Sequence, residues 1–255
     1  MSSCELKNGD CIEILPTLPM VDSIIIDPPY GTQTPEGYGY GRRQLYGGIG
    51  RTIENDSDLS LLETASPLMW NLAKENTWHG SFCAPRRMNE VMKIFEQAGF
   101  VYFGEIVWDK RQAGLGYAIR YQHESILIFQ KGEPVKADDA ILSVISCHTV
   151  KADTTKHPHA KPVPVMKRLV SWLCPEGGTV LDFTCGIGST GIACKETGRN
   201  FIGIEKSKEY FDIAQARIGS AQVSLFHAGL TPANNRLQWT GGESPALPGF
   251  STPEV

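Results

Sequence analysis

The chain contains no apolar run long enough to cross a membrane, no recognisable cleavable signal sequence and no surplus of positive charge. Its 255 residues include 24 Lys and Arg against 28 Asp and Glu, which gives a net charge of −4. This balance argues against a uniformly basic nucleic-acid coat, although local basic patches remain compatible with DNA binding. Without about 18 consecutive apolar residues, a membrane-spanning helix is not expected either. We therefore expect a soluble, cytoplasmic protein.

The seven cysteines include no CxxC pair. An odd number of cysteines without paired spacing is typical of reduced thiols in an intracellular protein. A zinc site is conceivable at Cys147, His148, His157 and His159, but their spacing matches no metal-binding framework. We expect no bound metal.

The most informative segment is the tetrapeptide Asp27-Pro28-Pro29-Tyr30, which follows the apolar run 23–26. Prolines lack an N–H donor and have a fixed φ, so a strand formed by that run ends there. Residues just past the carboxyl end of a buried strand lie where open α/β sheets bind ligands. The Asp27 carboxylate and the Pro28 carbonyl can accept hydrogen bonds from an NH2 group, and Tyr30 can stack on a ring. The segment predicts a site for a planar, amine-bearing substrate.

A second informative segment is the apolar run 179–182, followed by a turn with Gly186 and Gly188 and then by a second apolar run that ends at Glu205. This order predicts a strand–loop–helix–strand unit. Glycines let the backbone approach a ligand closely, and an acid about 20 residues further on is placed to bind ribose hydroxyls. The rest of the dinucleotide pattern GxGxxG matches poorly. A nucleoside cofactor without a pyrophosphate is therefore the better interpretation.

Taken together, DPPY, LDFTCGIG and FIGIE resemble the amino-group DNA methyltransferases, which use S-adenosylmethionine (SAM). The catalytic motif precedes the SAM motif, as in the circularly permuted β group of that family. The resemblance extends from about residue 5 to 218. Further similar segments occur in the family's order at Leu6–Asp10, Glu105–Lys110, His123–Phe129 and His157–Pro162.

This resemblance implies a Rossmann-like class I methyltransferase fold: an α/β domain with a seven-stranded, mostly parallel sheet, helices on both faces and a circularly permuted motif order. We expect one catalytic domain over residues 1–218 and a flexible tail over 219–255, which becomes rich in Gly, Pro, Ser and Thr. The target-recognition region of the family corresponds to residues 131–155. It is short here, so extended sequence specificity is not expected.

Residues 31–58 form a long segment dense in Gly, Tyr and Arg directly after DPPY. Long loops of this kind are usually functional or disordered. Interleaved aromatic and basic side chains suit stacking on bases and pairing with phosphates, so we expect a DNA-contacting loop. The alternative is a surface loop that packs on itself. The residues expected to contact DNA are Tyr38, Tyr40, Arg42, Arg43, Tyr46 and Arg51.

The expected catalytic residues are Asp27, Pro28, Pro29 and Tyr30, which would hold a base rotated out of the duplex. The resemblance places Asp10 near the adenine of SAM, although a Gly-Asp before a helix is also an ordinary N-cap. It also places Lys161 near the SAM carboxylate, with a plain surface lysine as the alternative. The other expected cofactor contacts are Asp182, Phe183, Gly186, Gly188, Ser189, Thr190 and Glu205.

The sequence favours methylation of the 6-amino group of adenine in double-stranded DNA, because DPPY is more typical of adenine enzymes within the family. Methylation of the 4-amino group of cytosine is the nearest alternative. From another class, an inactive SAM-fold protein that binds DNA or regulates a partner is also considered. The resemblance further suggests a homodimer and a cognate restriction endonuclease as partners.

Overall fold

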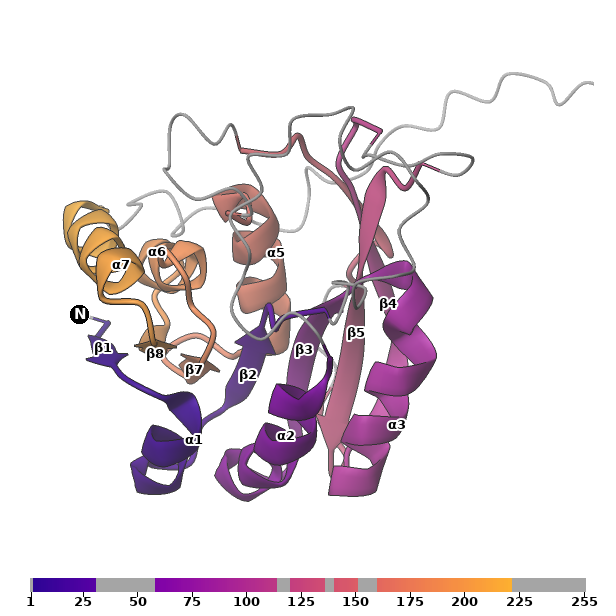
Figure 1. Ribbon diagram of the computed structural model, residues 1–255, viewed down its shortest axis with the longest axis horizontal. Coiled ribbons are helices and arrows are strands. Elements are labelled where there is room, and N and C mark those ends of the chain that lie inside the picture. Colours follow the sequence, from indigo (N-terminus) through magenta and orange to yellow (C-terminus); the bar gives the residue numbers. More distant parts are fainter. Residues whose placement is uncertain (1, 31–57, 114–119, 136–139, 151–159, 222–255) are drawn as a thin grey trace, which may run out of the picture. The chain divides into compact units, whose positions relative to one another are not determined.

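The computed structural model describes residues 2–30, 58–113, 120–135, 140–150 and 160–221. Within these residues the chain forms an eight-stranded sheet in the order β1-β8-β7-β2-β3-β5-β4-β6 (Figure 1). The strands are β1 (Cys4–Asn8), β2 (Ser23–Ile26), β3 (Thr77–Cys83), β4 (Val101–Asp109), β5 (His123–Lys131), β6 (Val144–Ser146), β7 (Thr179–Asp182) and β8 (Asn200–Glu205).

The sheet confirms the predicted α/β class and the mostly parallel arrangement. The pairings from β1 through β8, β7 and β2 to β3 are parallel, whereas β5 runs antiparallel to both β3 and β4. The predicted number of seven strands is wrong, because β6 adds an eighth. The strand β6 lies inside the predicted recognition region 131–155 and pairs in parallel with Val107–Asp109 of β4. The backbone groups along this side of β4 would otherwise lack strand partners, which is why a three-residue strand forms there.

Helices cover both faces of the sheet, as predicted (Figure 1). Residues of β2 show why both faces are apolar: Ile24 and Ile26 pack in the cluster that contains α2 and α3, while Ile25 packs in the cluster that contains α5 and α6. The helices are α1 (Cys11–Ile14), α2 (Ser60–Leu72), α3 (Met88–Ala98), α5 (Val163–Leu173), α6 (Ser189–Glu196) and α7 (Lys208–Ser220), with short 3-10 helices at Leu15–Thr17 and Pro85–Arg87.

The ends of two helices differ from the sequence-based expectation. Apolar residues at helical spacing predict a helix over 60–76, but α2 ends at Leu72. The Leu72 carbonyl accepts from the Val21 N–H, and the Lys74 N–H donates to the Val21 carbonyl, so neither group continues the helix. The buried ammonium of Lys131 also lies 2.9 Å from the carbonyl oxygens of Trp70 and Ala73, which satisfies the end of the helix. At the other end of the chain, α7 continues to Ser220, two residues past the predicted domain boundary at 218.

Several predicted features fall outside the described residues. These include all six residues of the expected DNA-contacting loop, the tail from 222 onward, and both His157 and His159. In the described part of the chain, no helix is long and apolar enough to cross a membrane. That same part contains no group of three His, Cys, Asp or Glu side chains arranged to hold a metal ion.

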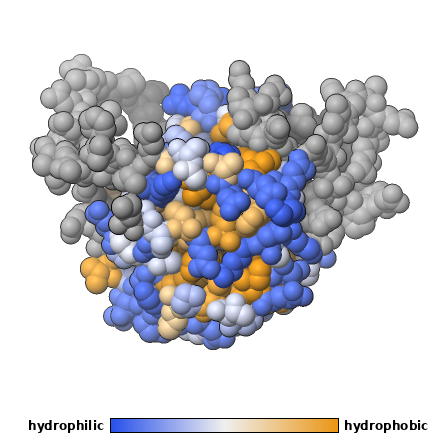
Figure 2. Space-filling view, turned by 90° about the vertical axis from the view of Figure 1, so that its left-hand side faces the viewer, coloured by the Kyte–Doolittle hydropathy of each residue, from blue (hydrophilic) through white to orange (hydrophobic). Residues whose placement is uncertain are grey.

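The β1 edge of the sheet faces the viewer in Figure 2, where hydrophobic patches lie among hydrophilic residues. A pocket of about 390 Å³ opens at this edge between β1 and α7, lined in part by Cys4, Leu6 and Gln215. The ammonium of Lys195, which also lines it, bonds to the carbonyl oxygens of Ile218 and Gly219. Lys195 thus caps the end of α7, and this structural role explains its position beside the pocket.

Close packing of α6 against β8 and α7 depends on Gly191. A Cβ atom there would lie 2.4 Å from Cδ1 of Ile218 and 2.7 Å from the buried ring of Phe201. We therefore expect Gly191→Ala to lower the free energy of unfolding by about 1–3 kcal/mol, measured by urea denaturation. The control is Gly219→Ala, where a Cβ meets nothing within 4 Å and the helix gains up to about 1 kcal/mol in propensity. Equal stability of the two variants would contradict this packing.

Candidate active site

The two informative segments of the sequence meet at the carboxyl ends of β2 and β7. These strands are parallel neighbours, so their ends lie at the same edge of the sheet. The backbone N–H of Asp27, directly after β2, donates to Oγ1 of Thr184, directly after β7, at 3.3 Å. The contact spans 157 positions of the sequence. The fold therefore places DPPY beside the glycine turn, where open α/β sheets bind ligands.

Asp27 is held on both of its carboxylate oxygens. The hydroxyl of Tyr30 donates to Oδ1 at 2.7 Å, and the ammonium of Lys161 bonds to Oδ2. Burial, followed by the negative charges of Asp27 and Glu124, raises the pKa of Tyr30 well above its ordinary value. Tyr30 is therefore a neutral hydroxyl and a hydrogen-bond donor at physiological pH.

Glu124 at the start of β5 is a site residue that the sequence analysis missed. Its Oε2 lies 3.1 Å from the Tyr30 hydroxyl and 3.3 Å from the Lys161 ammonium, and its Oε1 lies 2.6 Å from Lys110. Burial opposes ionisation of Glu124, but the two lysines outweigh burial and lower its pKa. The available signal was an acid at the start of an apolar strand, within the segment His123–Phe129 that resembles the family.

Lys161 is buried, with 8% of its side chain exposed. The alternative interpretation of Lys161 as an ordinary surface residue is therefore wrong. Lys161 lies just before α5, and its side chain is buried in the site. Burial lowers the pKa of Lys161, but Asp27 and Glu124 outweigh burial and raise it, so Lys161 remains charged. A buried ammonium is stable only when such partners surround it.

The glycine turn connects β7 to α6. Gly186 and Gly188 have φ angles of 53° and 79°, which L residues with a Cβ rarely adopt. Glu205 at the end of β8 fastens the turn, because its Oε2 accepts the Gly186 N–H at 2.9 Å and its Oε1 accepts the Ser207 N–H at 2.8 Å. Burial raises the pKa of Glu205, and these backbone donors partly offset that effect.

Asp182 anchors the other side of the turn. Its carboxylate accepts hydrogen bonds from the Thr190 hydroxyl at 2.6 Å and from the Thr184 N–H at 3.1 Å. Phe183, the next residue, is 2% exposed and packs in the core on the α2 and α3 face. The structure thus gives both residues a supporting position beneath the turn, and their expected contact with the cofactor stays a prediction.

Asp10 lies at the end of β1, beside the end of β8. Its Oδ1 accepts the Ile12 N–H at 2.9 Å, so it is the N-cap of α1. The Gly9 N–H bonds to the Glu205 carbonyl at 3.1 Å, which brings Asp10 to the same edge of the sheet as Glu205. The N-cap alternative is therefore confirmed, while a contact with the cofactor stays a prediction.

The residues around the turn fit a nucleoside cofactor that carries a positive charge. The acids Asp10 and Glu205 occupy neighbouring strand ends, and the hydroxyl of Ser189 is buried at the start of α6. Within the described part of the chain, the Ser189 Oγ has no hydrogen-bond partner. Such a hydroxyl requires a partner that the described residues do not supply, either a water molecule or a ligand atom.

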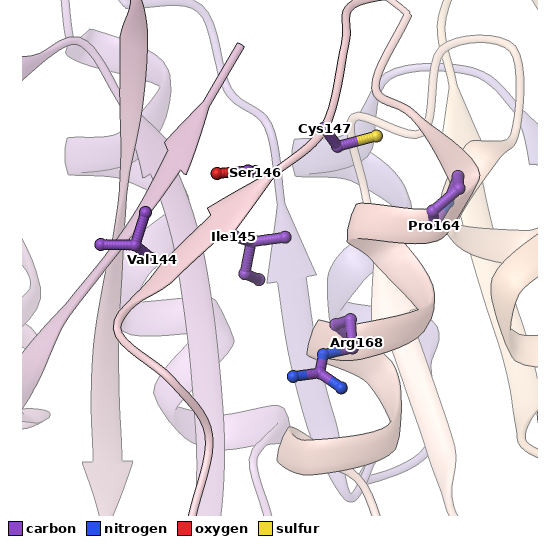
Figure 3. Close-up of a pocket in the computed structure, with 6 residues that line it drawn as sticks. All are labelled: Val144, Ile145, Ser146, Cys147, Pro164 and Arg168. Carbon is purple, nitrogen blue, oxygen red and sulfur yellow. The ribbon is translucent and has the colours of Figure 1, made fainter. Parts of the chain in front are cut away.

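A separate pocket of about 300 Å³ lies between β6 and the first turns of α5 (Figure 3). Val144, Ile145 and Ser146 line it from the strand, and Arg168 reaches toward it from the helix. None of the residues that line it belongs to the cluster around Asp27 or to the glycine turn. This pocket contributes no residue to the site described above.

Asp182 makes stability depend on pH. Burial is the main cause that raises its pKa from 3.8 to about 7, and the charge of Asp27 contributes. The folded protein therefore binds this proton more tightly than the unfolded chain does, and the resulting stability is lost as pH rises from about 4 through about 7. In Asp182→Asn the side chain stays neutral. We expect its free energy of unfolding, relative to wild type, to rise by about 3 kcal/mol at most between pH 5 and 8.

Urea denaturation at several pH values measures this difference, with the exposed Asp212→Asn as the control. Asp212 forms an ion pair with Lys208 on the surface of α7, with 53% of its side chain exposed. A difference between Asp182→Asn and wild type that does not change with pH would show that Asp182 is ionised throughout the range.

Comparisons with known proteins agree with this site. A family model described as DNA methylase matches residues 21–216. YubD of Escherichia coli (strain K12), named as a suspected methylase, is 31% identical over 219 residues, which cover 85% of this chain and 91% of YubD. The crystal structure of the M1.HpyAVI–SAM complex has a TM-score of 0.67 at 26% identity and covers 84% of this chain and 98% of its own.

The PvuII cytosine-N4-specific DNA methyltransferase has a TM-score of 0.68 over 85% of this chain and 86% of its own, at 15% identity, and so shows the fold alone. The fold and the paired strand-end motifs define a class I SAM-dependent methyltransferase. The chain belongs to the DNA methylase family. It is a SAM-dependent DNA amino-methyltransferase that acts on adenine or cytosine, and the predicted family is confirmed.

Proposed function

We propose that this protein methylates the exocyclic 6-amino group of adenine in double-stranded DNA. The observation that carries the proposal is the position of Asp27 at the end of β2, where its backbone N–H bonds to Thr184 in the loop that follows β7. This arrangement sets an acceptor for an amine beside the cofactor turn. The tetrapeptide with Asp at its first position favours adenine, because the cytosine-amine enzymes that the sequence resembles more often have Ser there.

The residues of DPPY address a chemical difficulty, since the lone pair of a ring-bound amine is delocalised and makes it a poor nucleophile. When the Asp27 carboxylate and the Pro28 carbonyl accept its two hydrogens, the nitrogen can move toward a tetrahedral geometry. The lone pair then attacks the sulfonium methyl in line: the N–C bond forms as the S–C bond breaks, the neutral thioether leaves, and the amine gives up one proton to the Asp27 carboxylate. Orientation supplies much of the rate. The base must first leave the duplex, and the Tyr30 ring offers it a stacking surface.

The residues around the glycine turn would hold the cofactor. SAM supplies the methyl group, which its sulfonium makes electrophilic. Glu205 would accept the ribose hydroxyls, and Asp10 would lie near the adenine. The backbone at Gly186 and Gly188 would pass beneath the methionine part, and the unpartnered Ser189 hydroxyl would find its acceptor or donor there.

The test is mass spectrometry of nucleosides from unmethylated double-stranded DNA incubated with the purified protein and SAM. N6-methyladenine is the expected product. N4-methylcytosine as the product would mean that the mechanism is the same but the target base is cytosine. Because the fold is shared with the PvuII enzyme, cytosine methylation is the second candidate function. SAM binding without any methylated base on varied DNA would overturn the proposal. It would favour an inactive SAM-fold protein that binds DNA or regulates a partner.

The remaining partners follow from the same proposal. The loop 31–58, with its six aromatic and basic residues, is proposed to contact DNA, and residues 131–155 to read a short target. A homodimer and a cognate restriction endonuclease are further proposed partners. Size-exclusion chromatography with light scattering measures directly whether the protein is a homodimer in solution.

A further inference from the structure

Asp27, the proposed catalytic acid, is one member of a partly buried cluster of four charges and one hydroxyl, which we call the Asp27 cluster. It consists of the carboxylates of Asp27 and Glu124, the ammonium groups of Lys161 and Lys110, and the hydroxyl of Tyr30. Its members come from the segment after β2, from the residue directly after β4, from the start of β5, and from the segment before α5. Two negative and two positive charges make the cluster neutral. In a poorly solvated site, each charge is stable only while its partner remains.

We propose that Lys161 and Glu124 are positioning residues for Asp27, an inference that rests on the proposed function. Lys161 binds Oδ2 of Asp27, and Glu124 holds Lys161 in place from the other side at 3.3 Å. The pair fixes the orientation of the carboxylate, so that Oδ1 is the oxygen presented to the substrate amine. This role differs from the contact with the SAM carboxylate that the family resemblance suggests for Lys161.

Tyr30 explains why Glu124 is needed as well as Lys161. A hydroxyl has one hydrogen and can donate to one acceptor at a time. The Tyr30 hydroxyl lies 2.7 Å from Oδ1 of Asp27 and 3.1 Å from Oε2 of Glu124, so two acceptors are within reach. When an amine N–H of the substrate takes Oδ1, the Tyr30 hydrogen turns to Glu124. Glu124 thus releases Asp27 for the substrate without leaving a buried hydroxyl unpaired.

Burial and ring contacts show that Lys161 is built into this position. Its ammonium lies 5.0 Å from the ring centre of Phe82 and 5.6 Å from that of Tyr30, both within cation–π range. With 8% of the side chain exposed, Lys161 has little freedom to leave. Glu124 is likewise restrained, because Lys110 holds its second oxygen at 2.6 Å.

The experiment is a double-mutant cycle with Lys161→Met, Glu124→Gln and the combined variant. The methionine removes the positive charge at similar volume, and the glutamine removes the negative charge but keeps an oxygen for Tyr30. We measure kcat from methylated nucleosides, SAM affinity by calorimetry and Tm. Lys161→Met is expected to lower kcat about 100-fold and to change the Kd for SAM less than about threefold, because the change affects Asp27 and not the cofactor.

The combined variant distinguishes charge pairing from ordinary structural damage. Lys161→Met leaves the carboxylates of Asp27 and Glu124 facing each other, and Glu124→Gln removes that repulsion. We therefore expect the combined variant to recover kcat about tenfold relative to Lys161→Met, and its Tm to recover in parallel. If each substitution merely disturbed the local packing, the combined variant would instead have a lower kcat and a lower Tm than Lys161→Met.

Two further variants control the measurement. Lys167→Met removes a lysine of α5 that pairs at 3.0 Å with Glu196, outside the Asp27 cluster, and should leave kcat and SAM affinity unchanged. Lys161→Arg keeps the charge and should retain kcat within about tenfold of wild type. If Lys161→Met does not fold, the comparison of Lys161→Arg with Glu124→Gln still tests the role of charge, since only the second should lose kcat strongly.

The outcomes separate this inference from the proposed function. A wild-type protein that methylates no base would overturn the proposed function. An active wild type whose Lys161→Met variant loses SAM affinity about tenfold with kcat unchanged would assign Lys161 to the cofactor and overturn the inference. A combined variant no faster than Lys161→Met would overturn it as well, because the two residues would then not act as a charge pair.

Discussion

Replacing Asp27 by Ala is expected to lower kcat for DNA methylation by at least about 1000-fold. The alanine removes the carboxylate that would accept a hydrogen bond from the amine, so the lone pair stays delocalised. It also removes a bond to Lys161 and a bond to Tyr30, both of which retain Glu124 as a partner. Nucleoside mass spectrometry over a time course measures the loss of methylated base, which the proposed function expects to be N6-methyladenine.

Asp27→Asn separates the charge of Asp27 from its shape. The amide keeps one oxygen for the substrate but weakens the bond to Lys161, so we expect an intermediate loss of about 10–100-fold in kcat. In both variants the Kd for SAM should stay within about threefold of wild type, because neither changes the glycine turn. An Asp27→Ala enzyme with near wild-type kcat would remove Asp27 from the mechanism.

Replacing Glu205 by Ala is expected to raise the Kd for SAM about 100-fold. Two effects combine in this variant. The expected bonds to the ribose hydroxyls are lost, and the Gly186 and Ser207 N–H groups lose their common acceptor. The turn then keeps the backbone bond from the Cys185 N–H to the Ile204 carbonyl of β8, but loses the bond that holds Gly186. Calorimetric titration with SAM, in the absence of DNA, measures the affinity directly.

Glu205→Gln is the informative companion to that variant. Its amide oxygen can still accept one backbone N–H, so the turn is supported while the charge is gone, and a smaller loss of about tenfold is expected. Asp212→Asn, on the exposed side of α7, should bind SAM as wild type does. Unchanged affinity in Glu205→Ala would mean that the acid serves only the turn and that another group binds the ribose.

Local patterns in the sequence were sufficient for the parts of the fold that depend on neighbouring residues. Apolar residues at helical spacing over 88–98 predict a helix, and α3 has the same bounds, since Gly99, with a φ of 112°, ends it. The two prolines after β2 likewise end that strand where expected. The motifs after β2 and β7 indicated the class of protein and its cofactor, because residues that follow the carboxyl end of a strand lie at the edge of the sheet where ligands bind.

Contacts between distant residues could not be predicted in the same way. Lys161 lies 134 positions from Asp27, and nothing local in the sequence shows that their side chains meet. Glu124 joins them because β5 inserts antiparallel between β3 and β4 and starts at the edge where β2 ends. The early end of α2 and the extra strand β6 have the same cause. Both depend on backbone hydrogen bonds to residues far away in the sequence, Val21 for α2 and β4 for β6. The residue types and their local order thus identified a methyltransferase, whereas the order of strands in the sheet determined which charges surround Asp27, its proposed catalytic acid.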